Sequence, residues 1–159
     1  MIEALKVLLR VKELKERQVF RALAAKRSQV GQAKAAIEIA REHMRTSSET
    51  LPEREDTIYR MIMSRIVDLD EVDETKGKVQ HLEAEHRKLV DAVERAIHVH
   101  ARLEKELLAV AEAYRNSIKE RDKYVALTEE LQAEKRAEVA HRDEAEVEDL
   151  FGNRRRRMA

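Results

Sequence analysis

Apolar residues recur along most of this chain at alternating steps of three and four. Counted from Ile2, thirteen of nineteen such positions up to residue 65 are apolar. Counted from Val79, eleven of sixteen positions up to Leu131 are apolar. A seven-residue repeat is typical of helices that pair along a narrow, left-handed coiled-coil seam. The pattern therefore predicts an all-α protein with two long helices, at about residues 2–66 and 70–148.

The two stripes also contain polar positions. The first stripe consists of Ile2, Leu5, Leu9, Lys12, Glu16, Val19, Leu23, Lys26, Val30, Ala33, Ile37, Ala40, Met44, Ser47, Leu51, Arg54, Ile58, Met61 and Arg65. The second consists of Val79, Leu82, His86, Leu89, Val93, Ala96, His100, Leu103, Leu107, Val110, Tyr114, Ser117, Arg121, Tyr124, Thr128 and Leu131.

An acidic segment from Asp68 to Glu74 separates the two stripes and contains several possible helix N-caps. It predicts a bend near residues 67–72, which leaves arms of similar length that can cover each other. We therefore expect residues 1–151 to form a single antiparallel coiled-coil hairpin. Residues 152–159 are expected to be a flexible basic tail.

Pro52 lies inside the first arm, where a proline removes a hydrogen bond and clashes with the preceding turn. Thr50 or Leu51 can cap a restarted helix with Pro52 in its first turn, so the sequence predicts a kink or short interruption there. A chain that turned back at Pro52 would have arms of very unequal length. That topology is the second candidate.

Composition agrees with an extended helical protein. Charged residues make up 40% of the chain and aromatic residues 3%, with three glycines and one proline among 159 residues. The 32 basic and 32 acidic residues are unevenly distributed: residues 1–50 have a basic excess, and residues 51–75 an acidic excess. Opposite charges on the two arms favour their pairing.

No apolar run is long enough to span a bilayer, and we expect a cytoplasmic protein without cofactors.

Catalytic and metal sites are not expected from this sequence. There is no cysteine, and His81 with His86, or His98 with His100, lack the i, i+4 spacing that places two ligands on one helical face. No glycine-rich phosphate loop occurs, and two helices rarely enclose a substrate. The carboxylates are best explained as a solvated surface, so we expect a protein that is not an enzyme.

Two features suggest partner binding. Tyr59, Ile62 and Met63 lie near the bend, off the predicted stripe, and an exposed apolar cluster often marks a partner site; local packing under the bend is the alternative. Arg154–Arg157 could contact an acidic protein or simply remain solvated. Without interleaved aromatics on a basic face, nucleic-acid binding is not expected.

The chain resembles the central-stalk proteins of bacterial type III secretion systems, the FliJ/YscO-like group, and is most similar to the YscO-like injectisome branch. Three segments carry the resemblance: the opening Leu5–Arg17, Glu55–Tyr59 ahead of a second-helix start at Asp68–Val72, and the closing Glu144–Phe151. The resemblance spans nearly the whole chain. The arginine run and Pro52 depart from the family pattern.

This resemblance implies a virulence-associated stalk that binds the hexameric secretion ATPase and the cytoplasmic domain of the export gate, peripheral to the secretion apparatus at the inner membrane. Chaperones of exported proteins are a further implied partner, and the chain is expected to be a monomer. By position, the resemblance implies two sets of partner-binding residues. The first set lies at the ATPase end and the second at the gate or chaperone end. The first set is Leu5, Leu9, Arg10, Lys12 and Arg17, with Leu150 and Phe151 opposite; the second is Tyr59, Ile62 and Met63.

A structural homodimer, in which the stripes pair between two chains, is the alternative function. The charged stripe positions Lys12, Glu16 and Lys26 disfavour a long symmetric parallel pairing. The sequence leaves open which end meets which partner, and whether the chain is itself exported.

Overall fold

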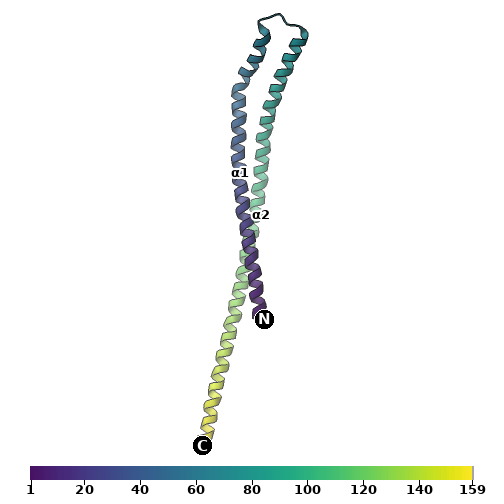
Figure 1. Ribbon diagram of the computed structural model, residues 1–159. Coiled ribbons are helices and arrows are strands. Elements are labelled where there is room, and N and C mark those ends of the chain that lie inside the picture. The colour runs from purple at the N-terminus through teal and green to yellow at the C-terminus, as the bar shows by residue number, and fades with distance from the viewer. Residues whose placement is uncertain (159) are drawn as a thin grey trace. The chain divides into compact units, whose positions relative to one another are not determined.

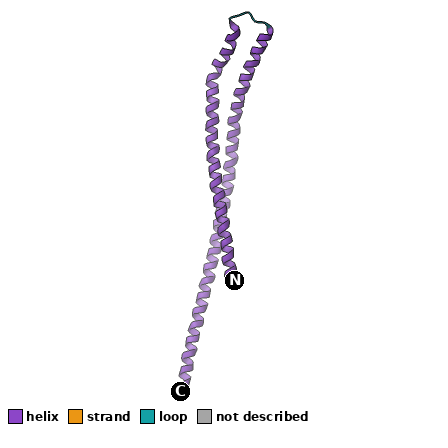
Figure 2. Ribbon diagram, viewed as in Figure 1, coloured by secondary structure: helices purple, strands orange, loops and turns teal. Residues whose placement is uncertain are grey.

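The computed structural model describes residues 1–158, which form two helices and no strand (Figures 1 and 2). Helix α1 spans Ile2–Met63 and helix α2 spans Leu69–Met158. The predicted all-α, antiparallel two-helix hairpin is confirmed. Its contacts divide into two units: a terminal unit of residues 1–23 with 110–158, and a loop unit of residues 24–109. No helix among residues 1–158 has an apolar stretch long enough to cross a membrane.

The two predicted stripes form the seam between α1 and α2 within each unit. Every position of the second stripe is buried or half-buried, and so is the first stripe from Ile2 to Leu51. Leu23 is the most buried apolar residue of the terminal unit, and Ala33, Ile37, Val79 and Val93 are buried in the loop unit. Among residues 1–158 no large side chain is fully buried, as expected for a core only one row of side chains wide.

Helix α1 continues through Pro52 without the interruption that the sequence allowed. Figure 1 shows α1 bending in its last quarter, the part that contains the proline. Nearby side chains supply donors for carbonyls at this point: Thr50 Oγ1 donates to the Thr46 carbonyl at 2.9 Å, and Arg54 Nη2 donates to the Ser47 carbonyl at 3.2 Å. The carbonyl that loses its backbone donor is that of Ser48, four residues before the proline, so these bonds lie beside the gap in the helix ladder and do not fill it.

After this bend the seam keeps the predicted position Ile58, which is half-buried, but departs from the other predicted stripe positions. Arg54, Met61 and Arg65 are exposed, whereas Glu55 and Ile62 are half-buried. Ile62 was expected on an outer face and instead lies on the inner side of α1. The half-buried positions Leu51, Glu55, Ile58 and Ile62 follow steps of four, three and four. A helix with 3.6 residues per turn drifts from a strict 3.5-residue count, and a four-residue step in place of a three-residue step absorbs this drift.

The connection between the helices is residues 64–68, a few residues earlier than the bend predicted at 67–72. The start of α2 is fixed by a reciprocal pair of hydrogen bonds. The Glu71 N–H donates to Asp68 Oδ1 at 2.9 Å, and the Asp68 N–H donates to Glu71 Oε2 at 3.3 Å. This arrangement is a capping box formed by aspartate and glutamate, and it sets the first turn of α2.

Helix α2 extends ten residues beyond its predicted end at residue 148. Arg155, Arg156 and Arg157 lie in its last turn, where positive charge is favourable beside the negative end of the helix dipole. The basic segment expected as a flexible tail is therefore helical through Met158. From Ala133 onward every described residue of α2 is exposed, so this final segment has no seam partner.

Glycines in the paired parts of both helices weaken them without serving a turn. Gly31 and Gly77 have helical backbones, and a methyl group added at either would meet no atom within 4 Å. We expect Gly31→Ala and Gly77→Ala each to raise the free energy of unfolding by about 0.5–1 kcal/mol. Chemical denaturation followed by circular dichroism measures this change. Gly152→Ala is the matched control, because it lies in the unpaired segment and should leave the unfolding midpoint unchanged; no rise for the first two variants would contradict the expectation.

Candidate functional surfaces

Lys12, which the resemblance placed at a partner-binding end, contacts α2 within the terminal unit. Its Nζ lies 3.1 Å from Glu120 Oε2 and 5.4 Å from the centre of the Tyr124 ring. The ammonium group beside it lowers the pKa of Glu120 below its ordinary value, chiefly through their hydrogen bond. Lys12 therefore joins α1 to α2 through an ion pair and a cation–π contact.

A second polar layer lies one turn further along α1. Glu16 Oε2 is 3.5 Å from Arg121 Nη1, and the Tyr114 hydroxyl donates to Glu16 Oε1 at 3.4 Å. The Phe20 ring lies against Tyr114 with 5.6 Å between ring centres. Because the Glu16 side chain is only 15% exposed, these contacts hold a charged group within the seam and restrict how the helices can align.

The loop unit contains a corresponding layer around Ser47. Ser47 Oγ lies 2.9 Å from His86 Nδ1, and the Arg54 guanidinium donates to the same oxygen at 3.1 Å. A serine beside a histidine can resemble a nucleophile and its base, but the arginine bond draws electron density from the oxygen. The cluster fits a structural layer across the seam. Among residues 1–158 no group of three acidic, histidine or cysteine residues is placed to hold a metal ion.

The residues expected at the ATPase end separate into seam and surface positions. Leu5 and Leu9 are half-buried along the seam, like Lys12, whereas Arg10 and Arg17 are exposed. This division could be predicted from the first stripe, because Leu5, Leu9 and Lys12 are among its positions. The free surface at the start of α1 is therefore more basic than the expected set implied.

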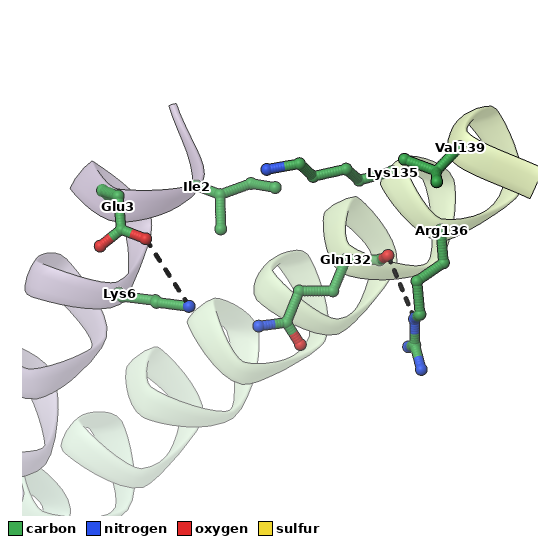
Figure 3. A pocket seen from close by; sticks show the side chains of 7 residues that line it. All are labelled: Ile2, Glu3, Lys6, Gln132, Lys135, Arg136 and Val139. Carbon is green, nitrogen blue, oxygen red and sulfur yellow. Dashed lines mark hydrogen bonds and ion pairs between the residues drawn. The ribbon is translucent and has the colours of Figure 1, made fainter. Parts of the chain in front are cut away.

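Leu150 and Phe151 do not lie opposite Leu5 and Leu9. The start of α1 instead meets an earlier part of α2, where Ile2 and Lys6 border a shallow cleft with Gln132 and Val139 (Figure 3). Leu150 and Phe151 lie further along the unpaired segment and are 70% and 63% exposed.

At the loop end, Tyr59 and Met63 are exposed as expected for a partner surface. Ile62 faces inward, as described above. Met61, Ile66 and Leu69 are exposed apolar residues that the sequence-based prediction of this surface did not include, although all belong to the same apolar-rich stretch. Ile66 lies in the connection itself and is fully exposed. The exposed apolar surface thus extends from the end of α1 through the connection to the start of α2.

Comparison with known protein families gives one match that covers most of the chain. The family described as "Type III secretion protein YscO" matches residues 5–153. The match includes most of both helices, the connection and most of the unpaired segment. No curated protein and no solved structure matches the chain.

Proposed function

Since the chain belongs to the YscO family of type III secretion proteins, we propose that it is a non-enzymatic stalk or adaptor of the secretion apparatus. In this role it binds the hexameric secretion ATPase and the cytoplasmic domain of the export gate. Chaperones of exported proteins are further proposed partners. The protein acts on the cytoplasmic side, peripheral to the apparatus at the inner membrane.

The observation that carries this proposal is the use of the seam within one chain, which leaves both units with separate exposed surfaces. In the terminal unit that surface includes Arg10 and Arg17 on α1, and Leu150 and Phe151 on α2. In the loop unit it is the apolar surface around Met63 and Ile66. Different exposed surfaces on the two units suit a protein that contacts more than one partner.

The alternative, a structural homodimer that pairs its stripes between chains, would need the same seam. The intrachain layers Lys12–Glu120 and Ser47–His86 would have to separate for that pairing. Their contacts support the single-chain stalk instead.

The test of the proposal is direct binding to the secretion ATPase of the same apparatus. Replacing both Arg10 and Arg17 with alanine should weaken binding about tenfold, because the two exposed guanidinium groups can pair with carboxylates on a partner. Isothermal titration calorimetry with the purified ATPase measures the loss. Neither arginine forms an ion pair within residues 1–158, so the substitutions should leave the hairpin folded.

The matched control is the variant with Arg87→Ala and Arg95→Ala, two exposed arginines in the loop unit. It removes the same charge and should bind as the unmodified chain does. Equal affinity for the ATPase in both double variants would show that the start of α1 is not the binding surface.

A further inference from the structure

Helix α1 has a second apolar stripe, on the face away from the seam. It consists of Val7, Val11 and Leu14, which are 59%, 51% and 57% exposed and lie on successive turns. We call these three residues the outer stripe. In a two-helix hairpin, apolar residues on this face pack against no other helix, because the seam is on the other side of α1.

Three arginines border the outer stripe on one side. Arg10 lies three residues after Val7 and four before Leu14, while Arg17 and Arg21 follow Leu14 by three and seven residues. All three are exposed, and none forms an ion pair within residues 1–158. The face is therefore both apolar and basic, so the complementary partner is an acidic amphipathic helix.

The chain itself contains such a helix. In the unpaired segment of α2, Val147, Leu150 and Phe151 are 50%, 70% and 63% exposed and share one face. Five carboxylates surround them, and none of the five has an ion-pair partner within residues 1–158: Asp143, Glu144, Glu146, Glu148 and Asp149. We call residues 143–151 the acidic segment. Its nine residues are comparable in length to the eight residues of α1 from Val7 to Leu14.

Within one molecule the two surfaces do not meet. The acidic segment continues α2 past the place where Ile2 meets Gln132 and Val139, and it is helical throughout. Turning it back onto α1 would break that helix. A second copy places no such demand on the chain, because its own α1 can lie beside the acidic segment.

We propose that the protein forms a reversible twofold dimer in which the acidic segment of each copy docks on the outer stripe of the other. The contact is isologous, so a single arrangement brings both acidic segments onto both stripes. A twofold axis across the helices makes α2 of one copy parallel to α1 of its partner. Each docked segment then packs on the face of α1 opposite the seam, so that three helices lie side by side. Each contact is short, which implies a dissociation constant on the order of micromolar.

This dimer covers residues that must be accessible for the proposed binding to the ATPase. Arg10, Arg17, Leu150 and Phe151 lie both in the dimer contact and in the terminal surface proposed for ATPase binding. Dimerisation and ATPase binding therefore compete, and the dimer is a reserve form that dissociates when the ATPase is available. The dimer itself is tested on the isolated chain, independently of the proposed function.

Sedimentation velocity over a range of concentrations tests the dimer with two complementary variants. One carries Arg10→Glu, Arg17→Glu and Arg21→Glu; the other carries Glu144→Arg, Glu146→Arg and Glu148→Arg. In each variant alone both contacts join like charges, so the dissociation constant should rise at least tenfold. When the two are mixed, one contact joins two reversed surfaces and the other two unmodified surfaces, so a 1:1 heterodimer should form.

The control variant carries Glu83→Arg, Asp91→Arg and Glu94→Arg, three exposed carboxylates of the loop unit without ion-pair partners in residues 1–158. It changes the net charge as the second variant does and should still dimerise. All substitutions are at exposed helical positions, and circular dichroism checks that each variant keeps its helix content. A wild-type chain that stays monomeric at high concentration would overturn the proposal, as would a dimer that the reversals do not weaken or a mixture without heterodimer.

Discussion

Replacing Leu23 with aspartate is expected to lower the free energy of unfolding by about 4 kcal/mol. Leu23 is 3% exposed and has the least exposed apolar side chain of the seam. Removing a buried leucine costs about 2–3 kcal/mol, and an unpaired carboxylate placed in the same space adds a desolvation cost of similar size. Urea denaturation followed by circular dichroism measures the loss.

Leu108→Asp provides the matched comparison, since Leu108 also lies in the middle of a long helix but is 68% exposed. Both substitutions carry the same penalty in helix propensity, below about 1 kcal/mol. The difference between the two variants therefore reports burial alone. Similar unfolding midpoints would mean that Leu23 is not in the seam, and the helix pairing of the terminal unit would then be wrong.

Reversing the charge of Glu16 is expected to have the second-largest effect, a loss of about 2 kcal/mol. In Glu16→Lys the new ammonium group lies beside Arg121 and one turn from Lys12, within a seam where Glu16 was largely shielded from water. Like charges in a partly desolvated position repel, and the Tyr114 hydroxyl loses its acceptor. Thermal and chemical unfolding measure the change.

A charge swap makes the same experiment specific to the pair. Adding Arg121→Glu to Glu16→Lys restores opposite charges across the seam and should recover more than half of the lost stability. Arg121→Glu alone should destabilise the chain, because two carboxylates then face each other. Strictly additive losses in the double variant would show that Glu16 and Arg121 do not interact in solution.

The seven-residue repeat predicted the architecture because the period of the apolar residues determines which faces of two helices pack together. Leu23, Ile37 and Val93 are buried where the stripes placed them. Beyond Pro52 the prediction holds at Ile58 but is wrong by one residue at the next position, where Ile62 replaces Met61 on the inner side. A strict seven-residue count assumes 3.5 residues per turn, and the sequence does not state where a helix of 3.6 residues per turn takes up the difference.

The candidate surfaces were harder to predict than the fold. Leu5 and Leu9 were assigned to a partner by resemblance, although their own stripe positions indicate the seam. The outer stripe was missed for a similar reason: Val7, Val11 and Leu14 were treated as part of a family motif, and their common spacing on a second face was not counted. Their exposure in the structure makes that face apparent.

The end of α2 was predicted too early because Gly152 was treated as the start of a tail. Glycine ends a helix when it adopts a left-handed backbone, and none of the described glycines has a positive φ. The arginines that follow are good helix formers, so nothing local requires the helix to stop there. Helix propensity of the flanking residues was the available signal.

The unpaired segment of α2 allows the protein to bind a partner selectively without binding it tightly. A helix of this length without a packed partner is marginally stable in water, so part of its population unfolds and refolds on the microsecond timescale. Any partner that holds residues 143–151 as a helix must offset the entropy of ordering them. Recognition can then remain selective, through the spacing of Val147, Leu150 and Phe151, while the complex stays weak enough to exchange partners rapidly.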